Sequence, residues 1–268
     1  MAWRQVAAAI AGCLALAVGG ATTAQAQEAF GYSRTGPGMG GSGKHVLEFF
    51  ELHYADNGIN QGFSGKIDFK PEVVKGDRQG GFWLVVSDGP NPKGDIGEYA
   101  ILYGDLKNNR ITAYEYNGQN GPSSFSEPGN FLQSFDNDPF TIDTDTGEVS
   151  FQIDVTSINA AFLNDPTRPD YDGIKFGQGT HKIGVWFHFS EDLRVNYEHI
   201  DGNLELTKFN LRHQGYVDFQ NKPATKKDCA DLPPDFPGCT TEISEPATLA
   251  LLGLGLVGLA ATRRRHIA

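Results

Sequence analysis

The sequence predicts an all-β protein, an antiparallel β-sandwich of the jelly-roll or lectin-like type. Several segments alternate apolar and polar residues with a period of two, which is typical of strands with one dry face. The chain is rich in turn formers, with 33 glycines and 14 prolines in 268 residues. Only the segment 156–164 has the pattern of a short helix. Many strands without alternating helices favour a sandwich over an α/β fold.

The strands are predicted from their side-chain patterns, in chain order. Alternation at 63–69, 149–155 and 183–189 predicts strands with one buried face. The segments 82–86 and 99–103 are apolar throughout, as expected of central strands. Two further strands are expected at 110–116 and 203–209, and turn-rich stretches such as "DGPNPKGD" and "DTDTGE" separate the strands. We therefore expect about nine or ten strands in one domain spanning residues 45–222.

The first 26 residues predict a signal peptide. Arg4 supplies the early positive charge, an apolar run follows, and Ala24 to Ala26 place small residues at the cleavage positions. An alternative is a lipoprotein attachment box at Ile10–Cys13. Residues 27–44 contain a G-x-G-x-x-G pattern, but no strand is predicted before it. We therefore expect a flexible Gly-rich linker there, and not a dinucleotide site.

Residues 223–243 are Pro-rich and lack periodicity, which predicts a stalk between the sandwich and the C-terminal tail. Removal of the signal peptide also removes Cys13 and leaves Cys229 and Cys239, in "CADLPPDFPGC". An even pair of cysteines in an exported chain predicts a disulfide, and two free thiols are the alternative.

Residues 247–262 carry no charged side chain and predict a single transmembrane helix. Such a helix is about 24 Å long, against about 30 Å for the hydrocarbon core, so it spans only with snorkelling by the neighbouring arginines. Arg263, Arg264 and Arg265 then keep this end cytoplasmic and place the large domain outside the inner membrane. A buried core helix is the alternative.

The same tail resembles the PEP-CTERM sorting signal of Gram-negative bacteria. Glu245-Pro246, the apolar run "ATLALLGLGLVGL" and the Arg-rich end match its plan, with Ser244 where the usual motif has its first proline. The resemblance covers residues 244–268. It implies recognition by an exosortase, processing near Glu245-Pro246, transient anchoring in the inner membrane, and delivery to the cell surface or extracellular matrix of a biofilm-forming, exopolysaccharide-making bacterium. It implies nothing about the chemistry of residues 27–243.

Composition and motifs restrict the function of the central domain. A net charge of −11 argues against nucleic-acid binding, which needs a basic face. The sequence contains no H-E-x-x-H, G-x-S-x-G or Walker pattern. We therefore expect a non-enzymatic surface or matrix protein without a cofactor. A carbohydrate-binding module for exopolysaccharide is one alternative, and a polysaccharide lyase or glycosidase, which would need paired carboxylates, is another.

Two weaker patterns suggest binding sites. Asp143, Asp145 and Glu148 place oxygen ligands close together and are weak calcium candidates, although this stretch also fits an ordinary hairpin turn. Tyr114, Tyr116 and Trp186 lie on predicted strands and could stack on sugar rings. Filling the core is the alternative role of these three rings, and the one that we favour.

Three histidines are candidate general bases. His53 lies near Asp56 in the sequence, and His181 and His188 flank or occupy the strand at 183–189. A base must lie within hydrogen-bond reach of its target, which a sequence does not reveal. A structural, hydrogen-bonded histidine is the commoner role.

Overall fold

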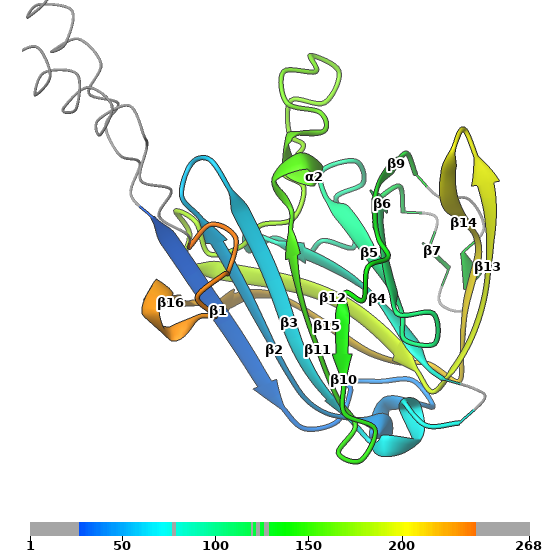
Figure 1. The fold of residues 1–268 in the computed structure, drawn as a ribbon. Helices are drawn as coiled ribbons and strands as arrows, with labels where there is room; N and C mark the ends of the chain where they lie inside the picture. Colours follow the sequence, from blue (N-terminus) through cyan, green and yellow to red (C-terminus); the bar gives the residue numbers. More distant parts are fainter. Residues whose placement is uncertain (1–26, 77–78, 119, 122–123, 126–128, 240–268) are drawn as a thin grey trace, which may run out of the picture. The chain divides into compact units, whose positions relative to one another are not determined.

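The computed structural model describes residues 27–239 except 77–78, 119, 122–123 and 126–128. Within this range the chain folds into two six-stranded sheets and a long separate hairpin, and all the strand ladders are antiparallel. Figure 1 shows the order of the strands. The prediction of an all-β antiparallel architecture is confirmed.

Each sheet combines neighbours in sequence with strands that return from elsewhere. Sheet A has the order β10 (Phe140–Ile142), β11 (Glu148–Asp154), β3 (Gln61–Phe69), β2 (Leu47–Asp56), β1 (Glu28–Thr35), β16 (Thr225–Lys227). Sheet B has the order β15 (Gly215–Pro223), β12 (Lys182–Ser190), β4 (Gly81–Ser87), β5 (Ala100–Asp105), β6 (Arg110–Glu115), β9 (Phe131–Phe135). Both contain a three-strand meander, β1–β3 and β4–β6. A jelly roll has eight strands in two Greek keys, so the narrower jelly-roll expectation is not confirmed.

The remaining elements are hairpins and short helical turns. The long hairpin is β13 (Asp192–Ile200) with β14 (Asn203–Arg212), and a two-residue pair joins β7 (Asn120–Gly121) to β8 (Ser124–Phe125). The helical turns are α2 (Thr156–Ala160), η1 (Lys44–Val46), η2 (Pro71–Val73) and η3 (Cys229–Asp231). Helix α2 is shorter than the predicted 156–164.

Aromatic rings fill the space between the two sheets. Phe50 of sheet A lies 5.6 Å from Phe187 of sheet B, between ring centroids, and Phe187 lies 5.7 Å from Phe82. Phe82 stacks on Phe151 of sheet A at 6.1 Å. Each such ring removes about 150–250 Å² from water. The inward half of the period-2 pattern therefore builds one continuous core.

The central strands of sheet B are buried on both faces. Every residue of β4 and of β5 is buried. Phe82 and Leu84 point into the core between the sheets, whereas Trp83 and Val85 join a second cluster that includes Phe209 of the long hairpin. Hairpin β13–β14, yellow in Figure 1, thus supplies a third layer over sheet B. The segments 82–86 and 99–103 are apolar throughout because both faces are covered.

The N-terminal segment is part of the sandwich, so the expectation of a flexible linker at 27–44 is wrong. Strand β1 pairs with β2 along its whole length, and Phe30 is fully buried. The glycines that follow β1 allow its chain to pass close to a neighbouring backbone segment. Gly41 has φ +84°, and a Cβ on it would lie 2.2 Å from the carbonyl oxygen of Gln214. The glycine spacing thus lets this segment pass against the backbone before β15.

The Pro-rich segment also packs on the domain, so the expectation of a stalk is wrong for its described part, residues 223–239. Strand β16 pairs with β1, and Leu232 and Phe236 bury against Ala29 and Ala55. The apolar positions between the prolines hold this loop on the end of sheet A. The compact unit therefore runs from residue 27 to residue 239, beyond the predicted limits of 45 and 222.

No helix in the described residues is long and apolar enough to cross a membrane. The predicted signal peptide at 1–26 and the predicted transmembrane helix at 247–262 lie outside the described residues.

The long hairpin is fixed to sheet B by two hydrogen bonds. The hydroxyl of Tyr197 donates to Asp105 Oδ2 at 3.0 Å, and the backbone N–H of Leu206 donates to the hydroxyl of Tyr114 at 2.8 Å. Asp105 is fully buried and also accepts the backbone N–H of Lys107 at 3.1 Å. Burial, followed by the charge of Asp105, raises the pKa of Tyr197, so this phenol stays protonated.

We predict that Tyr197→Phe lowers the free energy of unfolding by about 1–2 kcal/mol, because a buried carboxylate loses one donor. Urea unfolding followed by tryptophan fluorescence measures this change. Tyr32→Phe is the matched control, because among the described residues no hydrogen bond is seen from that half-buried phenol, and it should stay within about 0.5 kcal/mol of wild type. Equal stabilities of the two variants would contradict this account of the hairpin.

Candidate functional site

A polar groove lies on the outer face of sheet A, the face turned away from sheet B. Its volume is about 580 Å³. We call it the sheet A groove. It is lined by Glu51, His53, Ser64, Gly65, Lys66, Asn137, Asp138, Pro139, Thr141, Ser150, Phe151, Gln152, Asp231, Leu232, Pro233 and Asp235.

The strand register builds the floor of the sheet A groove. His53 on β2 lies opposite Ser64 on β3, which lies opposite Gln152 on β11. One step along, Glu51 faces Lys66, and Lys66 faces Ser150. Side chains alternate across a strand, so the polar half of each period-2 pattern falls on this one face. Three strands thereby place their polar side chains in two adjacent rows.

Two loops form the walls. The loop 137–139 before β10 closes one side, and the loop after η3 closes the other. Gln152 Nε2 donates to the backbone carbonyl of Asp235 at 3.2 Å, which ties β11 to the second wall. Asn109 Nδ2 donates to Asp138 Oδ1 at 3.1 Å, which holds the first wall, the loop 137–139. The walls are thus fastened to the sheets by side-chain hydrogen bonds.

His53 pairs with Glu51 and not with Asp56, its other acidic neighbour in the sequence. His53 Nε2 lies 3.3 Å from Glu51 Oε1, and Lys227 Nζ lies 3.8 Å from the same oxygen. The carboxylate of Asp56 instead accepts from the hydroxyl of Tyr54 and the amide of Gln61. Burial, the main cause, lowers the pKa of His53, while Glu51 acts in the opposite direction. The neutral ring therefore carries its proton on Nε2, toward Glu51.

The other ring nitrogen of His53 is buried and has no hydrogen-bond partner among the described residues. Gly31 on β1 lies beside it. A Cβ at Gly31 would lie 3.0 Å from His53 Nδ1 and 2.5 Å from Lys227 Cε. The glycine therefore leaves room for the Lys227 side chain to lie across this position. Neither ring nitrogen is turned to Ser64, so the sheet A groove contains no Ser–His–Glu relay.

The weak calcium candidates are engaged in local contacts. Asp143 Oδ1 accepts the backbone N–H of Asp145 at 2.8 Å, as in an Asx-turn, and these hydrogen bonds lower the pKa of Asp143. Asp145 faces Lys75 at 3.7 Å, and Glu148 pairs with Lys66 at 2.7 Å. In the part of the chain that the structure describes, no three His, Cys, Asp or Glu residues gather as a metal site.

The predicted sugar-stacking rings lie in the second apolar cluster, so they form no open stacking surface. Tyr114 and Tyr116 are 0% and 1% exposed, and Trp186 is 7% exposed. Hairpin β13–β14 covers this outer face of sheet B, and Tyr103 packs edge-on to Tyr114 at 6.0 Å. The alternative role, filling a core, is the one that the structure shows for these rings.

Trp186 takes part in a buried polar chain. Its Nε1 donates to His188 Nε2 at 2.7 Å, and His188 Nδ1 lies 2.8 Å from Gln214 Oε1, which places the ring proton on Nδ1. Trp83 stacks on the His188 ring at 4.0 Å, with Tyr216 on it at 5.4 Å. His188 is thus a structural histidine, held neutral among aromatic rings.

We predict that acid destabilises the fold through His188. Burial, the main cause, lowers its pKa to about 4, while unfolded histidine titrates near 6.5. The unfolded chain therefore binds the proton first, and stability falls as pH drops from about 6.5 to about 4, by up to about 3 kcal/mol. Above pH 6.5 this contribution is constant.

Urea unfolding at a series of pH values tests this prediction. His188→Gln should lose the part of the pH dependence that lies between 6.5 and 4, whatever its absolute stability. His199→Gln, at an exposed histidine of β13, is the control and should keep that part. The same slope in His188→Gln as in wild type would refute the role of His188.

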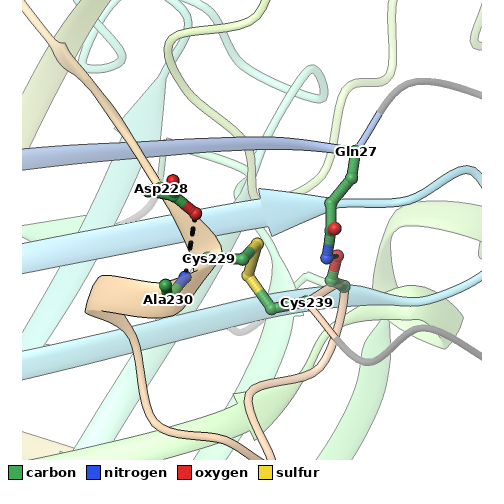
Figure 2. Close-up of a disulfide and its surroundings, with 6 residues drawn as sticks. Gln27, Asp228, Cys229, Ala230 and Cys239 are labelled. Carbon is green, nitrogen blue, oxygen red and sulfur yellow. Dashed lines mark hydrogen bonds between the residues drawn. A yellow bond between two sulfur atoms is a disulfide. The ribbon is translucent and has the colours of Figure 1, made fainter.

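The cysteine pair forms the predicted disulfide. Cys229 and Cys239 are joined, with their Cα atoms 5.4 Å apart, in the usual range for disulfides. Figure 2 shows the bond beside Gln27, whose Nε2 donates to the backbone carbonyl of Gly238 at 3.1 Å. Asp228 caps η3 by accepting the N–H of Ala230 at 3.0 Å. The first described residue and the end of the disulfide loop are thus bound together.

We predict that the double variant Cys229→Ser/Cys239→Ser loses about 2–3 kcal/mol of the free energy of unfolding, because the unfolded chain regains the entropy of an open loop. Guanidinium unfolding of oxidised protein measures the loss. Wild type treated with a reducing agent is the control and should match the double variant. Equal stability of oxidised and reduced wild type would contradict the prediction.

Most residues of the sheet A groove were missed at the level of sequence. The polar positions Ser64, Lys66, Ser150 and Gln152 are visible as the polar half of two predicted strands. Their common site depends on β2, which was not predicted as a separate strand, and on pairing between β3 and β11. A pairing over such a distance leaves no local signal.

Comparison with known proteins concerns the tail. Residues 242–265 match the family model described as the PEP-CTERM protein-sorting motif. The matched range contains Ser244, Glu245, Pro246 and the arginines at 263–265, and it lies outside the described residues. The chain has no significant match among curated proteins or among solved structures. The motif marks the chain as an exosortase-targeted exported protein.

Proposed function

Because the chain carries a PEP-CTERM sorting motif, we propose that it is a non-enzymatic protein of the bacterial cell surface or biofilm matrix. This motif is the observation that carries the proposal. The disulfide supports it, since such bonds persist in oxidising compartments outside the cytosol. Only residues 240–241 separate Cys239 from the matched segment, so the compact domain is the part that sorting delivers.

The proposed route has three steps. A signal peptide at 1–26 starts export in a Gram-negative cell. The apolar segment 247–262 then anchors the chain transiently in the inner membrane, with Arg263 to Arg265 on the cytoplasmic side. An exosortase finally processes the chain near Glu245-Pro246 and releases the domain to the surface.

The groups at the sheet A groove support a non-enzymatic role. Glu51, the carboxylate nearest to His53, is engaged by that ring and by Lys227. With the Lys227 side chain beside it over Gly31, His53 Nδ1 is buried and is not open to a substrate in this conformation. A lyase or glycosidase needs carboxylates that face the scissile bond. Turnover of a polysaccharide by the purified full chain would contradict this part of the proposal.

We predict that deletion of Arg263 to Arg265 blocks sorting, because the apolar tail loses the charges that hold its inner end. Cell fractionation with an antibody against the domain should then find less processed protein at the surface. Replacement of the three arginines by lysines is the control and should preserve sorting, since lysine keeps the positive charge. Normal processing of the deletion variant would refute the proposed role of the arginines.

The carbohydrate-binding alternative is favoured by one observation, the open polar groove on sheet A. The buried rings of Tyr114, Tyr116 and Trp186 do not favour it.

A further inference from the structure

We propose that the sheet A groove binds a glycan chain that carries no acidic groups. This deepens the proposed surface role by naming a ligand class for the delivered domain. The proposal rests on the chemistry of the lining, on its charge and on the rigidity of its floor.

The lining offers the hydrogen bonds that a polyhydroxylated ligand needs. Ser64, Ser150 and Thr141 present hydroxyls, which both donate and accept, and Gln152 and Asn137 add side-chain amides. A sugar hydroxyl also donates and accepts, so it can match this mixed set at several points. A lining of one kind, all donors or all acceptors, would instead suit a simple ion.

The charges select against acidic ligands. Glu51, Asp138, Asp231 and Asp235 line the groove, against Lys66 alone among the lysines and arginines. Lys66 is itself paired with Glu148 at 2.7 Å. A uronate chain, a phosphate or a nucleic acid would meet repulsion from these carboxylates. Neutral and amino-bearing sugars would not.

The floor is rigid and sparsely apolar. Its polar side chains stand on three paired strands, where their positions are fixed before a ligand arrives. Phe151 and Leu232 are 4% and 7% exposed, so the apolar contribution is small. Recognition therefore depends on hydrogen bonds, and removal of a few hydroxyls should weaken binding strongly.

His53 adds unused hydrogen-bonding capacity. A buried acceptor without a donor costs free energy, and His53 Nδ1 is such an acceptor. Lys227 lies beside it over Gly31, and its ion pair with Glu51 spans 3.8 Å. Displacement of this lysine side chain would let a ligand hydroxyl donate to Nδ1.

Binding of the purified full chain to an immobilised panel of neutral, amino-sugar and uronate oligosaccharides tests the proposal. Wild type should bind neutral or amino-sugar chains and not uronate chains. Ser64→Val/Ser150→Val should bind about tenfold more weakly, because two hydroxyls are lost while valine suits a strand. Thr207→Val, at an exposed position of β14 in the hairpin that packs on sheet B, is the matched control and should bind as wild type does.

A second variant distinguishes loss of binding from loss of folding. Ser150→Tyr fills the groove with a ring that strands tolerate, and it should abolish binding without changing the melting temperature by more than a few degrees. Absence of binding to every non-acidic chain, binding to uronates alone, or unchanged binding by both groove variants would overturn the proposal. Because the assay uses purified protein, such failure would leave the sorting result unaffected.

Discussion

Burial of sheet B between two apolar layers is the constraint on which the rest of the structure depends. Phe82 and Leu84 leave water on one face of β4, and Trp83 and Val85 leave it on the other. Hairpin β13–β14 makes the second burial possible, because its apolar side replaces solvent over β4, β5 and β6. Sheet A keeps an outer face whose alternate side chains are polar and partly exposed. The asymmetry between the sheets decides where a ligand can approach.

That asymmetry also explains why similar residues behave differently on the two sheets. His188 and His53 both occupy outer-face positions and both have lowered pKa values because of burial. His188 is enclosed by aromatic rings and satisfied by Trp186 and Gln214. His53 lies at the edge of a groove with one nitrogen unsatisfied. The first histidine is part of the packing, whereas the second retains a capacity to bind.

The sequence predicts much of the strand content and little of the site. Alternation identifies β3 and β11 because each has one dry face, and the even apolarity of β4 and β5 reports two buried faces. Strand β12 also alternates, but both of its faces are buried, because the second cluster covers Trp186. Strand β1 is not predicted, because the glycines after it are typical of a flexible linker. In the structure, Gly41 is required because its backbone passes close to the carbonyl oxygen of Gln214. Tyr114 and Trp186 were placed on strands as observed, but their cover comes from a distant hairpin. The groove depends on strand pairing over long separations, which local patterns do not encode.

The disulfide loop connects the sorting tail to the candidate site. One wall of the sheet A groove is formed by Asp231, Leu232, Pro233 and Asp235. Cys239 ends the same loop, with residues 240–241 between it and the matched sorting segment. The hydrogen bond from Gln152 to the loop fixes that wall against the sheet. Cys229 closes the loop at its other end. The disulfide thus closes the loop that forms one wall of the groove.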